Sequence, residues 1–252
     1  MRPVTRIVPC LDIKDGRIVK GVQFQGLTDM GDPAERAELY QSQGADEIVL
    51  LDVSATPEGR GHALTTVEKV RARLSIPLTV GGGVRQPEDA ARLLEAGADK
   101  VGVNTAAVER PGLIAEIADR FGSQCTVVAI DAKRMGNAWS VVVRSGSQDT
   151  LLDATDWAAK VIGLGAGEIL LTSFDRDGTR RGYDLDLIRA VSSVVTVPVV
   201  ASGGAANASD LVDGVTAGAS AVLIASMLHA DRTSVDRLKQ AMIQAGIEVR
   251  PC

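Results

Sequence analysis

The feature that most constrains the fold of this chain is an internal repeat with an offset of 121 residues. Three pairs of segments share this offset: GADEIVLL at Gly44 with GAGEILLT at Gly165, PLTVGGGV at Pro77 with PVVASGGA at Pro198, and AGADKVGVNTA at Ala96 with AGASAVLIASM at Ala217. A fourth pair, LDIK at Leu11 and IDAK at Ile130, has an offset of 119. Four matches in the same order predict a duplicated unit, with halves at approximately residues 1–122 and 123–252.

Short apolar runs alternate with amphipathic segments along the whole chain and predict eight strands. The predicted strands are Arg6–Ile13, Glu47–Val53, Pro77–Gly81, Lys100–Val103, Thr126–Asp131, Glu168–Ser173, Pro198–Ser202 and Ala221–Ala225. The runs are continuous, which is typical of strands covered on both faces. Eight strand–helix units in 252 residues predict one (β/α)8 barrel, a TIM barrel built from two fused half-barrels, as a single domain over residues 1–252.

An open doubly wound sheet is the alternative fold, and it often carries a glycine-rich dinucleotide-binding turn. The one candidate turn, GLGAGE at Gly163, has Glu168 where the third glycine belongs. It also precedes a predicted strand instead of following one, so it disfavours the open sheet.

Composition and charge exclude several classes of function. The net charge of −5 argues against a nucleic-acid or anionic membrane surface, and no apolar run approaches the roughly 18 residues that span a bilayer. Without a signal-like N-terminus or a disulfide-like cysteine pattern, a cytoplasmic protein is expected. Only two histidines, His62 and His229, are present. We therefore expect no metal site, and carboxylates as the carriers of any acid–base chemistry.

Polar residues stand where the predicted strands end, which is where (β/α)8 barrels place their active sites. Asp12 and Asp131 end equivalent strands of the two halves, so they are the predicted catalytic pair. Asp52 ends the second strand, where capping is as reasonable as function. Lys14 and Lys133 follow the paired aspartates by two residues, either as ligand contacts or as solvated partners.

Two glycine pairs predict two phosphate sites, because glycine lets backbone N–H groups approach an anion closely. Each pair is joined by the polar end of the next strand. The predicted phosphate-binding residues are Gly82, Gly83, Asn104 and Thr105 for the first site, and Gly203, Gly204, Ala225 and Ser226 for the second. The alternative is that each glycine pair only makes a tight turn. Lys20 and Asp177 are further candidates for substrate contact, and the segment from Asp15 to Asp32 is expected to be a long loop suited to a mobile lid.

Several long motifs closely resemble the cyclase subunits of imidazole glycerol phosphate synthase, from histidine biosynthesis. They are RIVPCLDIKDGRIVKG, ADKVGVNTAAV, FGSQCTVVAIDAKR and GAGEILLTSFDRDGTRRGYD, and the resemblance covers essentially the whole length. It implies a lyase that converts phosphoribulosyl-formimino-aminoimidazole carboxamide ribotide and ammonia to imidazole glycerol phosphate and aminoimidazole carboxamide ribotide. It also implies Asp12 and Asp131 as the acid–base pair, and no metal or organic cofactor.

Two other functions stay open from the residues. The sister isomerase of the same pathway shares the half-barrel repeat and performs an Amadori rearrangement. A non-catalytic barrel that only scaffolds a partner is the third reading.

Four charged residues stand at the N-terminal starts of predicted strands: Arg6, Glu47, Lys100 and Glu168. Barrel bottoms ordinarily serve stability, so a salt-bridged plug is one interpretation. The resemblance implies another, in which these residues form an ammonia gate above a separate glutaminase subunit, in a heterodimer. Asp99, beside Lys100, is then expected near the docking surface.

Overall fold

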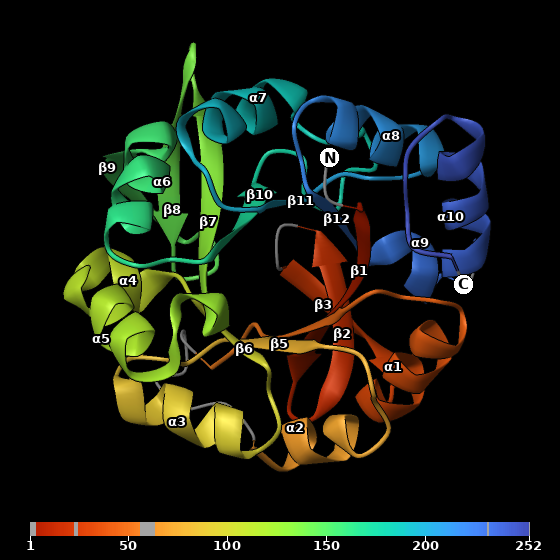
Figure 1. The fold of residues 1–252 in the computed structure, drawn as a ribbon, viewed down its shortest axis with the longest axis horizontal. Coiled ribbons are helices and arrows are strands. Elements are labelled where there is room, and N and C mark those ends of the chain that lie inside the picture. The colour runs from red at the N-terminus through yellow and green to blue at the C-terminus, as the bar shows by residue number, and fades with distance from the viewer. Residues whose placement is uncertain (1–3, 23–24, 56–63, 231, 252) are drawn as a thin grey trace.

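The structure, a computed structural model, describes residues 4–22, 25–55, 64–230 and 232–251. Eight parallel strands close into a barrel surrounded by helices (Figure 1), because β7 pairs with β10 to complete the ring. The barrel strands are β1 (Arg6–Lys14), β4 (Ile48–Asp52), β5 (Leu78–Gly81), β6 (Lys100–Val103), β7 (Thr126–Met135), β10 (Glu168–Ser173), β11 (Val199–Ser202) and β12 (Ala221–Ile224). The predicted single (β/α)8 barrel is confirmed.

The helices lie on the outside of the ring and connect successive strands. They are α1 (Pro33–Ser42), α2 (Leu64–Arg71), α3 (Pro87–Glu95), α4 (Thr105–Glu109), α5 (Gly112–Phe121), α6 (Ala154–Gly163), α7 (Leu185–Val194), α8 (Ala208–Thr216), α9 (Ser226–His229) and α10 (Val235–Gln244), with a short 3-10 turn, η1 (Ser123–Cys125). Among the described residues, no helix combines the length and apolar character needed to cross a membrane.

The repeat seen in the sequence recurs in the local structure. β5 and β11 differ by 121 residues, as do β6 and β12. The helices that follow β5 and β11 begin alike, because Asp89 accepts from the backbone N of Gln86 and Asp210 from that of Asn207, both at 3.2 Å. These reciprocal caps start the two helices at equivalent positions. The boundary near residues 122 and 123 stays a prediction.

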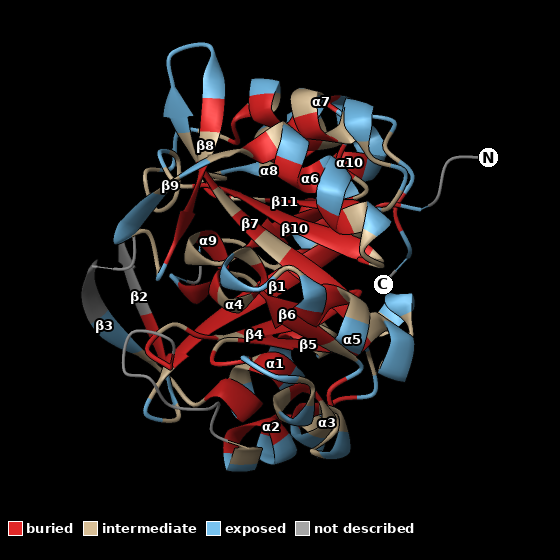
Figure 2. Ribbon diagram, turned by 90° about the vertical axis from the view of Figure 1, so that its left-hand side faces the viewer, coloured by how far each residue is buried: buried red, intermediate tan, exposed pale blue. Residues whose placement is uncertain are grey.

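Two apolar layers hold the barrel together, and Figure 2 shows buried residues throughout its strands. The larger layer packs between the strands and the outer helices. The smaller one fills the interior of the ring with side chains from six of the barrel strands: Val8, Cys10, Val49, Val127, Leu170, Val200, Ala221 and Leu223. The continuous apolar runs in the sequence therefore serve both faces of each strand.

The loop expected between Asp15 and Asp32 is wrong, because this segment forms an antiparallel hairpin. Its strands are β2 (Arg17–Val22) and β3 (Gln25–Gly31), and β2 pairs with the end of β1. Asp15 and Gly16 both have left-handed backbones, with φ of 51° and 74°. This is the backbone that tight hairpin turns require, and the Asp-Gly dipeptide signals it.

A second insertion follows β7, where the sequence runs through β8 (Ala138–Val143) and β9 (Gln148–Asp153). Met135 pairs with Ala138 across a turn at Gly136, as a hairpin at this point requires. In Figure 2 the added strands β2, β3, β8 and β9 lie on one side of the barrel. They extend its wall at the end where the active-site residues were predicted.

Candidate active site

A cavity of about 290 Å³ opens at the C-terminal ends of the barrel strands. Nearly all of the predicted catalytic and phosphate-binding residues line it: Asp12, Gly82, Gly83, Asn104, Thr105, Asp131, Asp177, Gly203, Gly204, Ala225 and Ser226. The structure thus brings together residues from both halves of the chain. Lys20 lies on β2, and its side chain is outside the described part of the structure.

The two aspartates occupy equivalent strand ends but have different neighbours. Asp12 is buried opposite Leu51 on β4, and its Oδ1 lies 3.4 Å from the Sγ of Cys10. Asp131 lies opposite Thr172 on β10, and the Nδ2 of Asn104 donates to its Oδ2 at 2.8 Å. The sequence predicted the pair but gave no sign of these different surroundings.

The pKa of the Asp131 carboxyl is raised from 3.8 to about 7. Burial is the largest cause, and the negative charges of Asp177 and Asp12 act in the same direction. Hydrogen bonds from Asn104 and Thr172 favour the charged form and partly offset the rise. Near neutral pH this carboxyl is therefore close to half protonated, which suits a group that exchanges protons.

Both glycine pairs turn tightly against neighbouring strand ends. Gly82 and Gly203 have φ of 104° and 93°, in the left-handed region that favours glycine. A Cβ on Gly82 would lie 2.3 Å from the backbone oxygen of Asp52, and one on Gly204 would lie 2.4 Å from that of Gly182. Tight turns are therefore one reason for these glycines. Because they also line the cavity, the hypothesis that they bind phosphate stays open.

Two residues whose roles were left open have partners outside the catalytic pair. Asp52 caps its own turn, because its Oδ1 accepts from the backbone N of Ser54 at 3.2 Å and of Ala55 at 2.9 Å. Lys133 lies 3.2 Å from Asp149 on β9. Capping therefore accounts for Asp52, and Lys133 on β7 pairs with a residue of β9, on the far side of β8.

The four charged residues at the strand starts meet in one ring across the floor of the barrel. Lys100 Nζ lies 2.9 Å from Glu47 Oε2 and 2.7 Å from Glu168 Oε2. Arg6 also pairs with both glutamates, at 2.8 Å to Glu47. Burial by itself would raise the pKa of Glu168, but Arg6 and Lys100 outweigh it and hold that pKa below its ordinary value.

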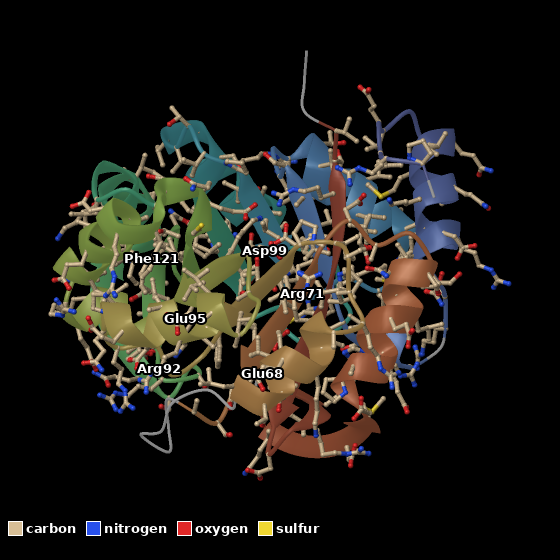
Figure 3. The ribbon with its side chains drawn as sticks, turned by 60° about the horizontal axis from the view of Figure 1, so that its bottom comes forward. Glu68, Arg71, Arg92, Glu95, Asp99 and Phe121 are labelled. Carbon is tan, nitrogen blue, oxygen red and sulfur yellow. The ribbon has the colours of Figure 1, made fainter. Side chains whose placement is uncertain are left out.

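Thr79 joins the floor to the cavity, a link that the sequence reasoning missed. Its Oγ1 donates to Glu47 Oε1 at 2.5 Å, and the same residue lines the cavity. A hydroxyl near the start of the third strand, between the charged strand starts at Glu47 and Lys100, was the available signal. Asp99 lies next to this floor, where it pairs with Arg71 at 2.9 Å (Figure 3) and accepts from the backbone N of Leu78.

No group of three or more His, Cys, Asp or Glu side chains is placed to hold a metal ion within the described residues. The site as described offers acid–base groups, backbone-rich turns and a charged floor.

Comparison with known proteins matches this arrangement to one family. Residues 6–234 match the family described as "Histidine biosynthesis protein". The chain is 55% identical over 249 residues to two proteins of Caulobacter vibrioides, each named imidazole glycerol phosphate synthase subunit HisF. One is from strain NA1000 / CB15N and the other from strain ATCC 19089 / CIP 103742 / CB 15. These alignments cover 98% of this chain and 96% of each relative.

The chain belongs to the HisF family. The resemblance drawn from its motifs is confirmed, and so is its assignment to histidine biosynthesis as an enzyme. The HisF relatives are named as subunits of a synthase. These names do not assign roles to individual residues, so the residue roles in this chain are inferred from the geometry of its site.

Proposed function

We propose that this chain is the cyclase subunit of an imidazole glycerol phosphate synthase. It converts phosphoribulosyl-formimino-aminoimidazole carboxamide ribotide and ammonia to imidazole glycerol phosphate and aminoimidazole carboxamide ribotide. Atom balance requires that one water leaves as well, because ammonia replaces a carbonyl oxygen. The reaction therefore needs protons removed from nitrogen and delivered to a departing oxygen and a departing nitrogen.

The observation that carries this proposal is the placement of two unlike aspartates in one cavity between two glycine turns. Asp131, with a pKa of about 7, holds a proton in part of the molecules at neutral pH and is the proton donor. Asp12, on the equivalent strand end, is the proton acceptor. Two carboxyls in different surroundings can divide acid and base roles in this way.

The substrate lies across the mouth of the barrel with one phosphate at each glycine turn. The first phosphate binds at Gly82, Gly83, Asn104 and Thr105, and the second at Gly203, Gly204, Ala225 and Ser226. All eight residues line the cavity that also holds the aspartates. Backbone N–H groups and hydroxyls bind phosphate without a metal, so catalysis needs no metal or organic cofactor.

Ammonia reaches the aspartates through the floor of the barrel, between Arg6, Glu47, Lys100 and Glu168. The interior above this ring is apolar, from Val8 and Val49 up to Cys10. A neutral molecule such as ammonia crosses apolar surroundings at far lower cost than a charged one. A glutaminase subunit docked against the N-terminal face, near Asp99, supplies the ammonia, and the two chains form a heterodimer.

The experiment that tests the proposal uses the purified chain, the ribotide substrate and ammonium salt at alkaline pH, where more ammonia is neutral. Both products should form in equal amounts, the rate should rise with free ammonia, and a metal chelator should not reduce it. Rearrangement of the isomerase substrate without ammonia would indicate the sister isomerase instead. Absence of turnover with either substrate would leave the scaffold reading.

A further inference from the structure

The charge of the cavity poses a problem for a substrate with two phosphates. Carboxylates outnumber cations among the described residues that line it: Asp12, Asp52, Glu109, Asp131 and Asp177 against Arg85, Arg144 and Arg180. Two phosphates bring further negative charge into this space. Each lining arginine is therefore a candidate for phosphate recognition, and Arg144 is the one whose surroundings are best defined.

Arg144 lies in the turn between β8 and β9, in the inserted part of the chain. Arg144 and Ser145 have left-handed backbones, with φ of 54° and 55°, although neither is glycine. Contacts to two barrel strand ends hold this turn. The backbone N of Arg144 donates to Thr105 Oγ1 at 3.0 Å, and the Oγ of Ser145 donates to the backbone oxygen of Val53 at 3.2 Å.

The bond to Thr105 also orients a hydroxyl of the first phosphate site. Because the Thr105 oxygen accepts from Arg144, its own hydrogen is directed away from that bond and can be donated to an anion. The backbone of Arg144 thus lies one hydrogen bond away from the proposed phosphate position. A side chain as long as arginine reaches an anion held there.

The guanidinium of Arg144 is paired with Glu109, with Nη2 and Oε1 2.7 Å apart. Both side chains are about half exposed, at 47% and 53%, and both residues line the cavity. An exposed pair of this kind contributes little to stability and is easily exchanged. A phosphate dianion offers arginine two acceptor oxygens and a larger charge than a carboxylate does.

We propose that Arg144 is a specificity-determining residue for the first phosphate, and that Glu109 holds its guanidinium until phosphate displaces it. The inference deepens the proposed function, on which it rests. It assigns to the β8–β9 insertion a role in substrate recognition. It also predicts that the two members of the pair act in opposite directions on binding.

The test compares Arg144→Gln and Glu109→Gln with the wild-type chain in ammonia-dependent turnover. Arg144→Gln should raise KM for the ribotide about tenfold, the usual scale for a lost charge-assisted hydrogen bond. Its kcat should stay within about twofold of wild type, because the contacts of Arg144 are with Thr105 and Glu109 and not with the catalytic pair. Glu109→Gln should lower KM about threefold, because phosphate no longer competes with a carboxylate.

The matched control is Arg73→Gln, which breaks an exposed 2.9 Å pair between Arg73, just after α2, and Glu38 on α1 and should leave KM unchanged. A KM for Arg144→Gln within about twofold of wild type would overturn the proposal, as would a Glu109→Gln variant that loses affinity. Titration of the same variants with inorganic phosphate separates this result from the proposed function. A tenfold weaker Kd in Arg144→Gln supports the inference even for a chain without turnover, and equal Kd values would contradict it.

Discussion

At the mouth of the barrel the two halves contribute matching parts, whereas at the floor they do not. Asp12 matches Asp131, and each glycine pair is followed by a hydroxyl residue at the next strand end, Thr105 or Ser226. At the floor, Glu47 matches Glu168, but Ala221 stands where the first half has Lys100. The first half therefore supplies three of the four charged floor residues, and the second half supplies one.

This difference indicates that the mouth and the floor of a duplicated barrel meet different functional requirements. In the proposed binding mode, a substrate with a phosphate at each end meets like groups on both sides, so the mouth benefits from keeping its symmetry. The proposed single ammonia entrance on the barrel axis and the proposed docked partner have no twofold requirement. The floor could therefore change in one half without loss to the other.

Even the mouth is not fully symmetric, and the departures lie around the aspartates. Thr172 faces Asp131 across the strand pair, while Leu51 faces Asp12. Asn104 donates to Asp131, while Ala225 stands at the equivalent position of the other half. The two equivalent carboxyls thus have different neighbours, which suits different proton-transfer roles: Asp131 has Asn104 and Thr172, whereas Asp12 has Leu51 and the thiol of Cys10.

The largest expected effect comes from removing either carboxylate of the pair. Asp12→Asn and Asp131→Asn should each lower kcat for ammonia-dependent turnover by at least about 100-fold, the usual scale for a lost acid–base group. The ribotide should still bind, because the glycine turns are untouched. A wild-type kcat in either variant would refute the catalytic role of the substituted aspartate. A loss of kcat in only one variant would mean that the two aspartates do not act as a pair.

The stability of Asp131→Asn provides the control for that result. Because the folded-state pKa of Asp131 is raised from 3.8 to about 7, the wild type loses stability as pH rises between these values. The Asn variant carries no such carboxyl. Its melting temperature should therefore be at least that of wild type at pH 8, and the two should converge below about pH 4.

A second prediction concerns a buried ion pair between the two halves, whose aspartate has no counterpart at the equivalent position of the second half. Lys239 on α10 lies 2.9 Å from Asp46 Oδ1, with both side chains about 2% exposed, and Asp46 also accepts from the backbone N of Ile7. Gly167 takes the place of Asp46 in the second half, where a Cβ would lie 2.1 Å from the backbone oxygen of Ser123.

Lys239→Met should lower the free energy of unfolding by about 2 kcal/mol, because it leaves the Asp46 carboxylate buried without its cation. This is below the usual cost of such a change, since Arg250 Nε lies 4.0 Å from the same oxygen. The double variant Asp46→Asn/Lys239→Met should recover most of the loss in urea unfolding. No recovery would mean that packing of the lysine stem, and not its charge, stabilises the contact between the halves.

A third prediction concerns a substitution that gives the floor of the first half the residue found in the second half. Lys100→Ala places the residue found at Ala221 in the equivalent position and removes a cation from both glutamates. With the glutaminase subunit present, glutamine-dependent turnover should fall about tenfold, which corresponds to about 1.4 kcal/mol. Turnover with added ammonia should change less than twofold. Equal losses with both nitrogen donors, together with a lower melting temperature, would favour a plain structural plug.

The smallest expected effect is on the pH profile of Asn104→Ala, which gives Asp131 the neighbour that the other half has. The amide of Asn104 lowers the pKa of Asp131, so its removal should raise that pKa above the wild-type value of about 7. At a fixed concentration of free ammonia, the alkaline decline of kcat/KM should move to higher pH. An unchanged decline would place the titrating group elsewhere.

Sequence patterns sufficed for the barrel and for most of the residues around its mouth. The offset of 121 residues located Gly203 from Gly82, because a duplicated fold repeats the positions of its turns. The strands β2 and β3 were missed because the glycines of this segment were taken as signs of a loop, although Asp15 and Gly16 form the tight turn between β1 and β2.

Other features of the site depend on contacts that no pattern along the chain contains. The bond between Asn104 and Asp131, the pairing of Asp131 with Thr172 and the contact of Thr79 with Glu47 all join neighbouring strands. Their existence follows from strand register, which is set only when the barrel closes. The raised pKa of Asp131 follows from burial in that closed barrel and could not be read from the residue type.

The most direct test of the account is a crystal structure of the inactive Asp131→Asn variant with the ribotide substrate bound. We predict one phosphate at Gly82 and Gly83, the other at Gly203 and Gly204, and the reacting carbon between Asp12 and Asn at position 131. The guanidinium of Arg144 should have left Glu109 for the first phosphate. A substrate bound with either glycine turn empty, or away from the two aspartate positions, would contradict a single active site shared by both halves.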